Sequence, residues 1–197
     1  MCLSINFFSF MEVYVIRHTQ VAVGKDICYG QSNVPLADTF IQDAKQFSEQ
    51  LLIDFDAVYC SNSQRCKDLA TELKFENVLF DRSLMEINFG DWENKKWNDI
   101  DQDKLNDWMV DFVNVKTPNG ENLTDLFQRV QLFFNELRKK EHKKVLIITH
   151  AGVIRCLWAY LLDIPLKNIF KIPVGYNEIF LCKLGKERMY DSIRIVK

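Results

Sequence analysis

Two histidines stand at the ends of hydrophobic strands, a position from which their imidazoles can bind a ligand or react with it. Residues 13–16 are apolar or aromatic and mostly β-branched, which is typical of a buried strand, and Arg17 and His18 follow at once. Residues 144–149 form a second such strand that runs into His150. The chain has only three histidines, so two of them take this position. Because strand ends form the usual ligand edge of an α/β sheet, we expect both imidazoles at one site.

Two further charged residues occupy positions that suit a reaction centre. Arg65 falls in the first turn of a helix expected over residues 64–75, where the helix dipole is already positive. An arginine there is easier to explain if an anion binds beside it; the alternative is a solvated surface arginine. Glu86 lies between apolar residues, where partial desolvation suits a carboxyl group for proton transfer; the alternative is an exposed loop glutamate. His142 belongs to a charged run that is typical of a solvated face, so we assign it no role.

Arg17, His18, Arg65, Glu86 and His150 together predict a compact site for a phosphate group. Arginine offers bidentate hydrogen bonds to phosphate, and the helix expected after the second histidine adds backbone N–H groups and its dipole. A neutral imidazole can attack phosphorus to give a phosphohistidine, while the other cations stabilise the transferring charge and the carboxyl group protonates the leaving alkoxide. Since side chains supply the positive charge, we expect no metal and no other cofactor.

The elements that must position these residues alternate between strand and helix. Besides the two strands above, strands are expected at residues 57–60, 77–80, 178–184 and 188–196. Helices are expected at residues 39–52, 64–75, 123–140 and 152–162. This order predicts a three-layer α/β/α sandwich with a mostly parallel sheet and an antiparallel edge. Residues 93–115 are rich in Trp, Asp and Asn, and we expect them to be a helical insertion over the site that shapes substrate choice.

Composition and charge exclude several classes of protein. The 197 residues fit one domain, and a net charge of −2 with a pI of about 6.0 gives no basic field for nucleic acid. No apolar run is long enough for a membrane span. Six scattered cysteines without a Cys-x-x-Cys pair favour reduced thiols in a cytoplasmic protein. Residues 1–10 lack the marks of a signal peptide; we expect Met11 to be the functional start, residues 1–10 a dispensable extension and residues 11–197 the domain.

Blocks of this sequence resemble the histidine phosphatase superfamily, also called the phosphoglycerate mutase-like family. They come in the family order and span nearly the whole chain from Met11. The blocks are Arg17-His18-Thr19, Cys60-Ser61-x-x-x-Arg65, Glu86-x-x-Phe89-Gly90-x-Trp92-Glu93, Pro118-x-Gly120-Glu121 and Thr149-His150-Ala151-Gly152-Val153-Ile154-Arg155. The set is highly specific, whereas any single block would be a weak indication.

The resemblance implies a role for each matching charged residue. His18 would be the phosphorylated nucleophile and Glu86 the proton donor. Arg17, Arg65 and His150 would bind the phosphoryl group. The implied partner is a small phosphate monoester, with no nucleic acid or membrane, and the enzyme would be a monomer or a homodimer.

The resemblance also implies a substrate pocket, with some departures from the family pattern. Gly30, Gln31 and Ala151 fall where the family lines that pocket. Thr19 replaces the usual glycine of the first block and places a side chain where the backbone normally passes close to phosphate. Gly24 stands where many members have an asparagine that contacts phosphate. No departure removes a charged catalytic group.

Residues 28–36 and 89–93 are similar to the α-ribazole phosphatase branch, which acts in the nucleotide-loop part of cobalamin synthesis. That similarity implies hydrolysis of α-ribazole 5′-phosphate. The alternatives are a phosphatase of broad specificity and a mutase-like enzyme that retains and rebinds phosphate; the chain is shorter than typical mutases. An inactive phosphate-binding regulatory module is disfavoured because all the charged catalytic groups are intact. The remaining alternative is a plain α/β binding protein whose histidines belong to the core.

Overall fold

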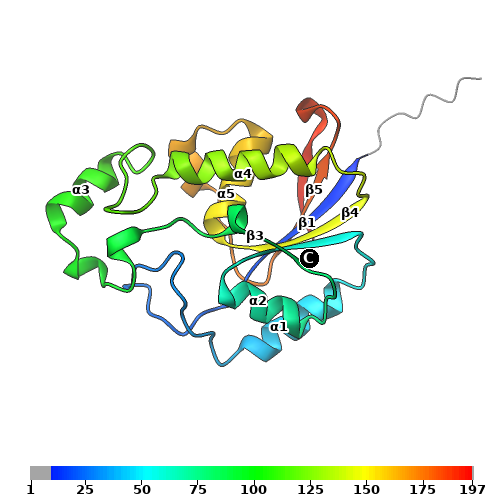
Figure 1. Cartoon of the computed structure of the whole chain (residues 1–197), viewed down its shortest axis with the longest axis horizontal. Coiled ribbons are helices and arrows are strands. Elements are labelled where there is room, and N and C mark those ends of the chain that lie inside the picture. The colour runs from blue at the N-terminus through cyan, green and yellow to red at the C-terminus, as the bar shows by residue number, and fades with distance from the viewer. Residues whose placement is uncertain (1–9, 197) are drawn as a thin grey trace, which may run out of the picture.

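A computed structural model describes residues 10–196 of the chain (Figure 1). The extension expected at residues 1–10 therefore lies, apart from Phe10, outside the described residues. The strands are β1 Met11–Arg17, β2 Ala57–Ser61, β3 Leu79–Asp81, β4 Lys144–Thr149, β5 Ile179–Leu184 and β6 Ser192–Val196. The α-helices are α1 Phe40–Gln50, α2 Gln64–Glu72, α3 Gln102–Val110, α4 Leu123–Leu137 and α5 Ala151–Leu162.

The described strands form one sheet in the order β3-β2-β4-β1-β5-β6. Strands β1, β2, β3 and β4 pair in parallel, and β5 and β6 add an antiparallel edge, as the sequence predicts. In the β1–β4 pair, Arg17 is the partner of Thr149, so both strands end at the same level. The residues that follow them, His18 and His150, are therefore brought to neighbouring points on one edge.

Strands β1 and β4 are buried on both faces, which explains their continuous apolar sequences. On one face, Val15 and Ile147 pack in the core under α4 and α5. On the other face, Ile16 and Ile148 pack in a second core under α1 and α2. Figure 1 shows the two pairs of helices on opposite sides of the sheet. The predicted three-layer α/β/α sandwich is confirmed.

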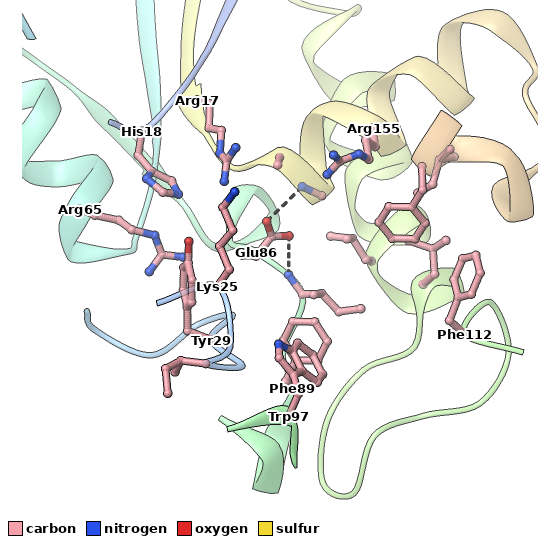
Figure 2. Close-up of a pocket in the computed structure, with 18 of the residues that line it drawn as sticks. Arg17, His18, Lys25, Tyr29, Arg65, Glu86, Phe89, Trp97, Phe112 and Arg155 are labelled. Carbon is pink, nitrogen blue, oxygen red and sulfur yellow. Dashed lines mark hydrogen bonds between the residues drawn. The ribbon is translucent and has the colours of Figure 1, made fainter. Parts of the chain in front are cut away.

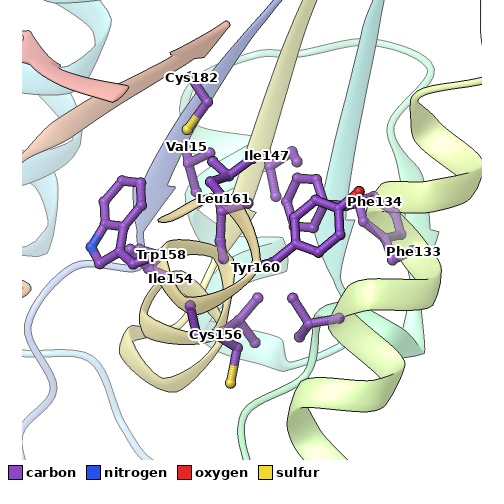
Figure 3. Packing of buried hydrophobic residues seen from close by; sticks show 14 of the residues in the cluster. Val15, Phe133, Phe134, Ile147, Ile154, Cys156, Trp158, Tyr160, Leu161 and Cys182 are labelled. Carbon is purple, nitrogen blue, oxygen red and sulfur yellow. The ribbon is translucent and has the colours of Figure 1, made fainter. Parts of the chain in front are cut away.

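The core between the sheet and helices α4 and α5 is rich in aromatic side chains (Figure 3). Trp158 of α5 meets Phe180 of β5 edge to face, with ring centroids 5.0 Å apart. Tyr160 stacks on Phe134 of α4 at 6.1 Å. Such pairs contribute roughly 0.5–1.5 kcal/mol each beyond the area they bury. This packing fixes α5, and with it the backbone N–H groups at its first turn, relative to the ends of β1 and β4.

Several predicted elements differ from the structure. The last strand, expected from residue 188, begins at Ser192 because Arg188–Tyr190 form a short 3-10 helix. Strand β3 begins at Leu79 rather than at residue 77, because Asn77 has a left-handed backbone with φ of 54° and forms a turn. Residues 93–115 contain one short α-helix, α3, and a 3-10 helix at Trp97–Asp99, and are otherwise turns and loops. This segment contributes Ile100 and Leu105 to a small core that also contains Cys28 and Trp92. No helix among the described residues is long and apolar enough to cross a membrane.

Candidate active site

His18 and His150 meet at the carboxyl ends of β1 and β4. The backbone N–H of His18 donates to Thr149 O at 2.9 Å, continuing the strand pairing by one residue. The two ring centroids are 5.1 Å apart and the ring planes are inclined by 60°. His18 is 2% exposed and His150 is fully buried. Two imidazoles that lie 132 positions apart in the sequence therefore share one site.

Hydrogen bonds give the two rings opposite tautomers. His18 Nδ1 lies 2.7 Å from Thr19 O; since a carbonyl oxygen only accepts, Nδ1 carries the proton and Nε2 keeps a lone pair. Arg65 Nη2 lies 3.1 Å from His150 Nδ1, and a guanidinium only donates, so the proton of His150 is on Nε2. That Nε2 is 2.8 Å from the Ser61 hydroxyl.

Arg65 is the cation closest to the paired rings. It lies in the first turn of α2, is 2% exposed, and donates to the carbonyl oxygens of Gly30 at 2.6 Å and Ser32 at 2.9 Å. Its buried Nε has no hydrogen-bond partner among the described residues. The carbonyl bonds hold the guanidinium against the histidines, where its charge favours an anion.

Arg17 supplies a second guanidinium from the end of β1. Its Nη1 donates to Val174 O at 3.2 Å and its Nη2 to the Tyr176 hydroxyl at 2.9 Å. The guanidinium carbon also lies 3.8 Å from the centre of the Tyr176 ring. Tyr176 in turn lies edge to face with His18 at 6.0 Å between ring centroids. This tyrosine therefore holds Arg17 beside the first histidine.

Burial and neighbouring cations keep both imidazoles neutral. Burial, then the charges of Arg65 and Arg17, hold the pKa of His18 well below its usual range. Burial, then Arg65, His18 and Arg17, lower the pKa of His150 in the same way. At neutral pH the site thus combines two permanent cations with two uncharged rings.

Glu86 reaches the site from the loop after β3. Its Oε1 accepts from the backbone N–H of Ile87 at 2.9 Å, and its Oε2 accepts from that of Gly152 at 3.0 Å (Figure 2). Gly152 lies in the first turn of α5, and a Cβ there would come within 2.1 Å of Glu86 Oε1. The glycine of the last sequence block is therefore needed for the carboxyl group to approach the helix.

The charged groups line one end of a cavity of about 440 Å³. Figure 2 shows Arg17, His18 and Arg65 on one side of Glu86 and aromatic rings on the other. The aromatic residues that line this second part are Phe89, Trp97, Trp108, Phe112 and Phe170. A molecule that joins a compact anion to an aromatic or apolar group would match both ends.

A family model described as histidine phosphatase superfamily (branch 1) matches residues 13–190. The chain belongs to the histidine phosphatase superfamily. This confirms the resemblance drawn from the sequence blocks, whose residues contribute the charged end of the cavity.

Relatives of this histidine phosphatase carry related names. The adenosylcobalamin/α-ribazole phosphatase of Escherichia coli (strain K12) is 28% identical over 173 residues, which cover 83% of this chain and 85% of the relative. The protein of the same name from Salmonella typhimurium is 28% identical over 185 residues, covering 88% and 92%. The crystal structure of the α-ribazole phosphatase from Shigella flexneri has a TM-score of 0.86 at 25% identity and covers 94% of this chain and 96% of that one.

Of the three residues that we expected to line the substrate pocket of this histidine phosphatase, one lines the cavity and two lie behind its wall. Ala151 lines the cavity, but Gly30 and Gln31 do not. Gln31 Nε2 donates to Glu86 O at 3.0 Å, and a Cβ on Gly30 would come within 2.0 Å of Ile87 O. The loop that carries them packs against the Glu86 loop, so both residues lie behind the cavity wall. His150 likewise lies behind the lining residues, beneath His18.

Other groups at the histidine phosphatase site do not stand out in the sequence. Tyr176 follows Gly175 in a loop, and only the tertiary contact with Arg17 reveals it. Tyr29 lies 5.5 Å from the Arg65 guanidinium, and burial followed by a hydrogen bond with Tyr176 raises its pKa to about 12. Lys25 follows the departure at Gly24, lines the cavity and extends toward Arg17 (Figure 2). The sequence indicates Lys25 only indirectly, because this lysine stands next to Gly24, where many family members have an asparagine.

The described residues contain no group of three or more His, Cys, Asp or Glu side chains placed to hold a metal ion. The positive charge near the histidines comes from guanidinium and ammonium groups instead. Five cysteines in the described part of the chain are free and buried.

Proposed function

We propose that this histidine phosphatase hydrolyses phosphate monoesters through a phosphohistidine formed on His18. The tautomer of His18 supports this role, because Nδ1–H donates to Thr19 O and leaves the Nε2 lone pair for attack on phosphorus. The low pKa of His18 keeps the ring uncharged, and therefore nucleophilic, at neutral pH. The closeness of this neutral imidazole to two guanidiniums and a second imidazole is the observation that carries the proposal.

In the first step Nε2 of His18 bonds to phosphorus while the bond from phosphorus to the leaving-group oxygen breaks. Glu86, in its protonated form, gives its proton to that oxygen. In the second step a water attacks phosphorus, the nitrogen–phosphorus bond breaks, and the Glu86 carboxylate takes a proton from the water. Inorganic phosphate and the free alcohol are the products.

Arg17, Arg65 and His150 stabilise the charge on the transferring group. Arg65 is already oriented by the loop carbonyls, and Arg17 by Tyr176, so little reorganisation accompanies the reaction. The ring of His150 packs against His18, and its Nε2–H donates to the Ser61 hydroxyl at 2.8 Å, so it contributes a neutral, polar group beneath the phosphoryl site. Lys25 adds a fourth cationic or polar group at the position where the family asparagine is absent.

We propose α-ribazole 5′-phosphate as the substrate. Relatives with that activity in their names, at 28% identity over most of the chain, support this choice. The aromatic end of the cavity supports it independently, because α-ribazole is a benzimidazole nucleoside whose flat base suits a lining of aromatic rings. The free, buried cysteines are consistent with the expected cytoplasmic location. That the enzyme is a monomer or a homodimer remains a prediction.

A turnover screen tests the proposal. The purified chain is assayed for phosphate release from α-ribazole 5′-phosphate, ribose 5-phosphate and 3-phosphoglycerate. We expect the nucleotide to have the highest kcat/KM, with ribose 5-phosphate lower because it lacks the base. Equal values for all three would favour a phosphatase of broad specificity, and isomerised phosphoglycerate without free phosphate would indicate a mutase. No turnover and no phosphoenzyme would favour a phosphate-binding module.

A further inference from the structure

Arg129 of α4 grips the backbone of the loop that carries Glu86. Its Nη1 donates to the carbonyl oxygens of Ser83 at 2.8 Å and Met85 at 2.6 Å, and its Nη2 donates to that of Glu86 at 2.8 Å. Its Nε and Nη2 also form a bidentate pair with the Glu121 carboxylate, both at 2.9 Å. A guanidinium has five N–H donors, and these contacts use all five.

Glu121 extends this grip to the far side of Glu86. Its Oε2 accepts from the backbone N–H of Asn88 at 2.9 Å, and its own N–H donates to Asn88 O at 2.8 Å. The side chains of Arg129 and Glu121 are 19% and 22% exposed, so the pair is largely shielded from water. The loop backbone is thus held on both sides of Glu86 by one ion pair.

The Glu86 carboxyl group itself has few restraints of its own. Its two oxygens accept only backbone N–H groups, those of Ile87 and Gly152. Because Glu86 is attached to the loop and Ile87 belongs to it, a shift of the loop backbone moves the carboxyl group relative to the Gly152 N–H and the cavity. Arg129 is absent from the cavity lining and faces a separate hollow shared with Glu121 and Asn88, so it approaches the loop from behind.

We infer that Arg129 and Glu121 are positioning residues that set where the Glu86 carboxyl group meets the leaving-group oxygen. This inference rests on the proposed function, in which Glu86 is the proton donor. A general acid must lie within about 2.6–3.2 Å of the oxygen it protonates, and a displacement of about 1 Å can lower the rate roughly a hundredfold. Loosening the grip on the loop allows such a displacement without touching the phosphoryl site.

Arg129→Lys separates geometry from charge. Lysine keeps the positive charge, which also acts on His150, but has three donors and no planar fork. Glu86 also serves the second step, which is the same for every ester, so the two esters are compared by kcat/KM, which reports the phosphorylation step alone. We expect kcat/KM for an alkyl phosphate, whose leaving group needs a proton, to fall roughly 10- to 100-fold. We expect kcat/KM for p-nitrophenyl phosphate, whose leaving group needs little protonation, to change less than about threefold. Glu121→Gln, which removes the charge of the partner, serves as a second variant with the same expected pattern.

The two esters are then compared in a double-variant cycle with Glu86→Gln. If Arg129 acts through Glu86, adding Arg129→Lys to Glu86→Gln lowers kcat/KM for the alkyl phosphate no further. Arg82→Lys is the matched control, because Arg82 is exposed and borders the same hollow; it should leave both rates unchanged.

Two results would overturn the inference: equal losses of kcat/KM on both esters in Arg129→Lys and Glu121→Gln, or losses of kcat/KM that multiply in the Glu86→Gln background. Failure of the wild-type chain to release phosphate from α-ribazole 5′-phosphate or from any other phosphate monoester is a different result, since it would refute the proposed function itself.

Discussion

In the imidazole of His18, one nitrogen is hydrogen-bonded to the protein and the other is free to react with substrate. Nδ1–H donates a hydrogen bond to Thr19 O, which orients the ring and fixes the tautomer that nucleophilic attack requires. Arg65 imposes the opposite tautomer on His150, which then presents an N–H. A single hydrogen bond to each ring therefore makes His18 a nucleophile and His150 a hydrogen-bond donor. The pairing of β1 with β4 places the two histidines side by side.

Glu86→Gln tests the proton donor. The amide keeps the size of the side chain but cannot donate an acidic proton, so kcat/KM should fall roughly 10²- to 10⁴-fold for alkyl phosphates and much less for p-nitrophenyl phosphate. The measurement is kcat/KM, which reports the phosphorylation step, across a series of esters with leaving groups of increasing pKa, where the variant should show a steeper dependence. Equal loss for every leaving group would rule out Glu86 as the acid.

The charged residues of the site were predictable because each stands next to a readable feature. Arg17, His18 and His150 stand at the ends of apolar strands, and Arg65 stands in the first turn of a predicted helix. Tyr176 and Arg129 were not predictable in this way, since their partners lie far away in the sequence: 159 positions separate Tyr176 from Arg17. Gly30 and Gln31 were placed in the pocket by position, but whether a loop residue faces the cavity depends on packing against the Glu86 loop.

Residues 93–115 bring three aromatic rings to the cavity. Trp97, Trp108 and Phe112 line it, and the rings of Trp97 and Trp108 stack at 6.4 Å with an interplanar angle of 21°. Helix α3 carries Trp108 and lies away from the sheet (Figure 1). This segment can therefore vary without disturbing the ends of β1 and β4, which suits a role in substrate choice.

Trp108→Leu tests that role. Leucine keeps apolar bulk but removes a flat surface, so kcat/KM for α-ribazole 5′-phosphate should fall about tenfold, equivalent to roughly 1.4 kcal/mol. The value for ribose 5-phosphate, which has no base, should stay unchanged. The control is Val110→Ala on the same helix, because Val110 is 88% exposed and does not line the cavity. A parallel decrease for both substrates would argue against recognition of the base by this segment.

The sheet could be predicted more completely than the segment over the site. Alternation of apolar strands with amphipathic helices predicted the helices on both faces of the sheet. Asn122 and Asp125 form a capping box at the start of α4, and this pattern can be read in the sequence as Asn followed three residues later by Asp. The turn at Asn77 and the irregular path of residues 93–115 were not predictable, because neither has a hydrophobic period. The small core around Trp92 and Leu105 forms only when distant loops come together.

Burial of two neutral histidines makes the stability of the folded chain depend on pH. The unfolded chain binds protons at these residues below about pH 6.5, whereas the folded chain does not until a much lower pH. Above about pH 6.5 both states are neutral and the two residues contribute no pH dependence. Below it the unfolded state binds more protons, so the free energy of unfolding falls as the pH falls.

Urea unfolding at pH 7, 6 and 5 measures this dependence. Each histidine should lower the free energy of unfolding by up to about 1.4 kcal/mol per pH unit below pH 6.5. His150→Asn should flatten the curve over the same interval, because it removes one titrating group while keeping polar atoms near Arg65 and Ser61. A wild-type free energy of unfolding that stays constant from pH 7 to pH 5 would show that the histidines are charged in the folded state.

The phosphohistidine itself is the feature on which the proposed reaction depends. A rapid-quench experiment with p-nitrophenyl phosphate, stopped in alkali and followed by peptide mass spectrometry, locates the phosphoryl group during turnover. We expect it on the peptide that contains His18, and we expect neither the phosphopeptide nor turnover in His18→Ala. A phosphoryl group on another residue, or undiminished turnover by His18→Ala, would contradict the mechanism.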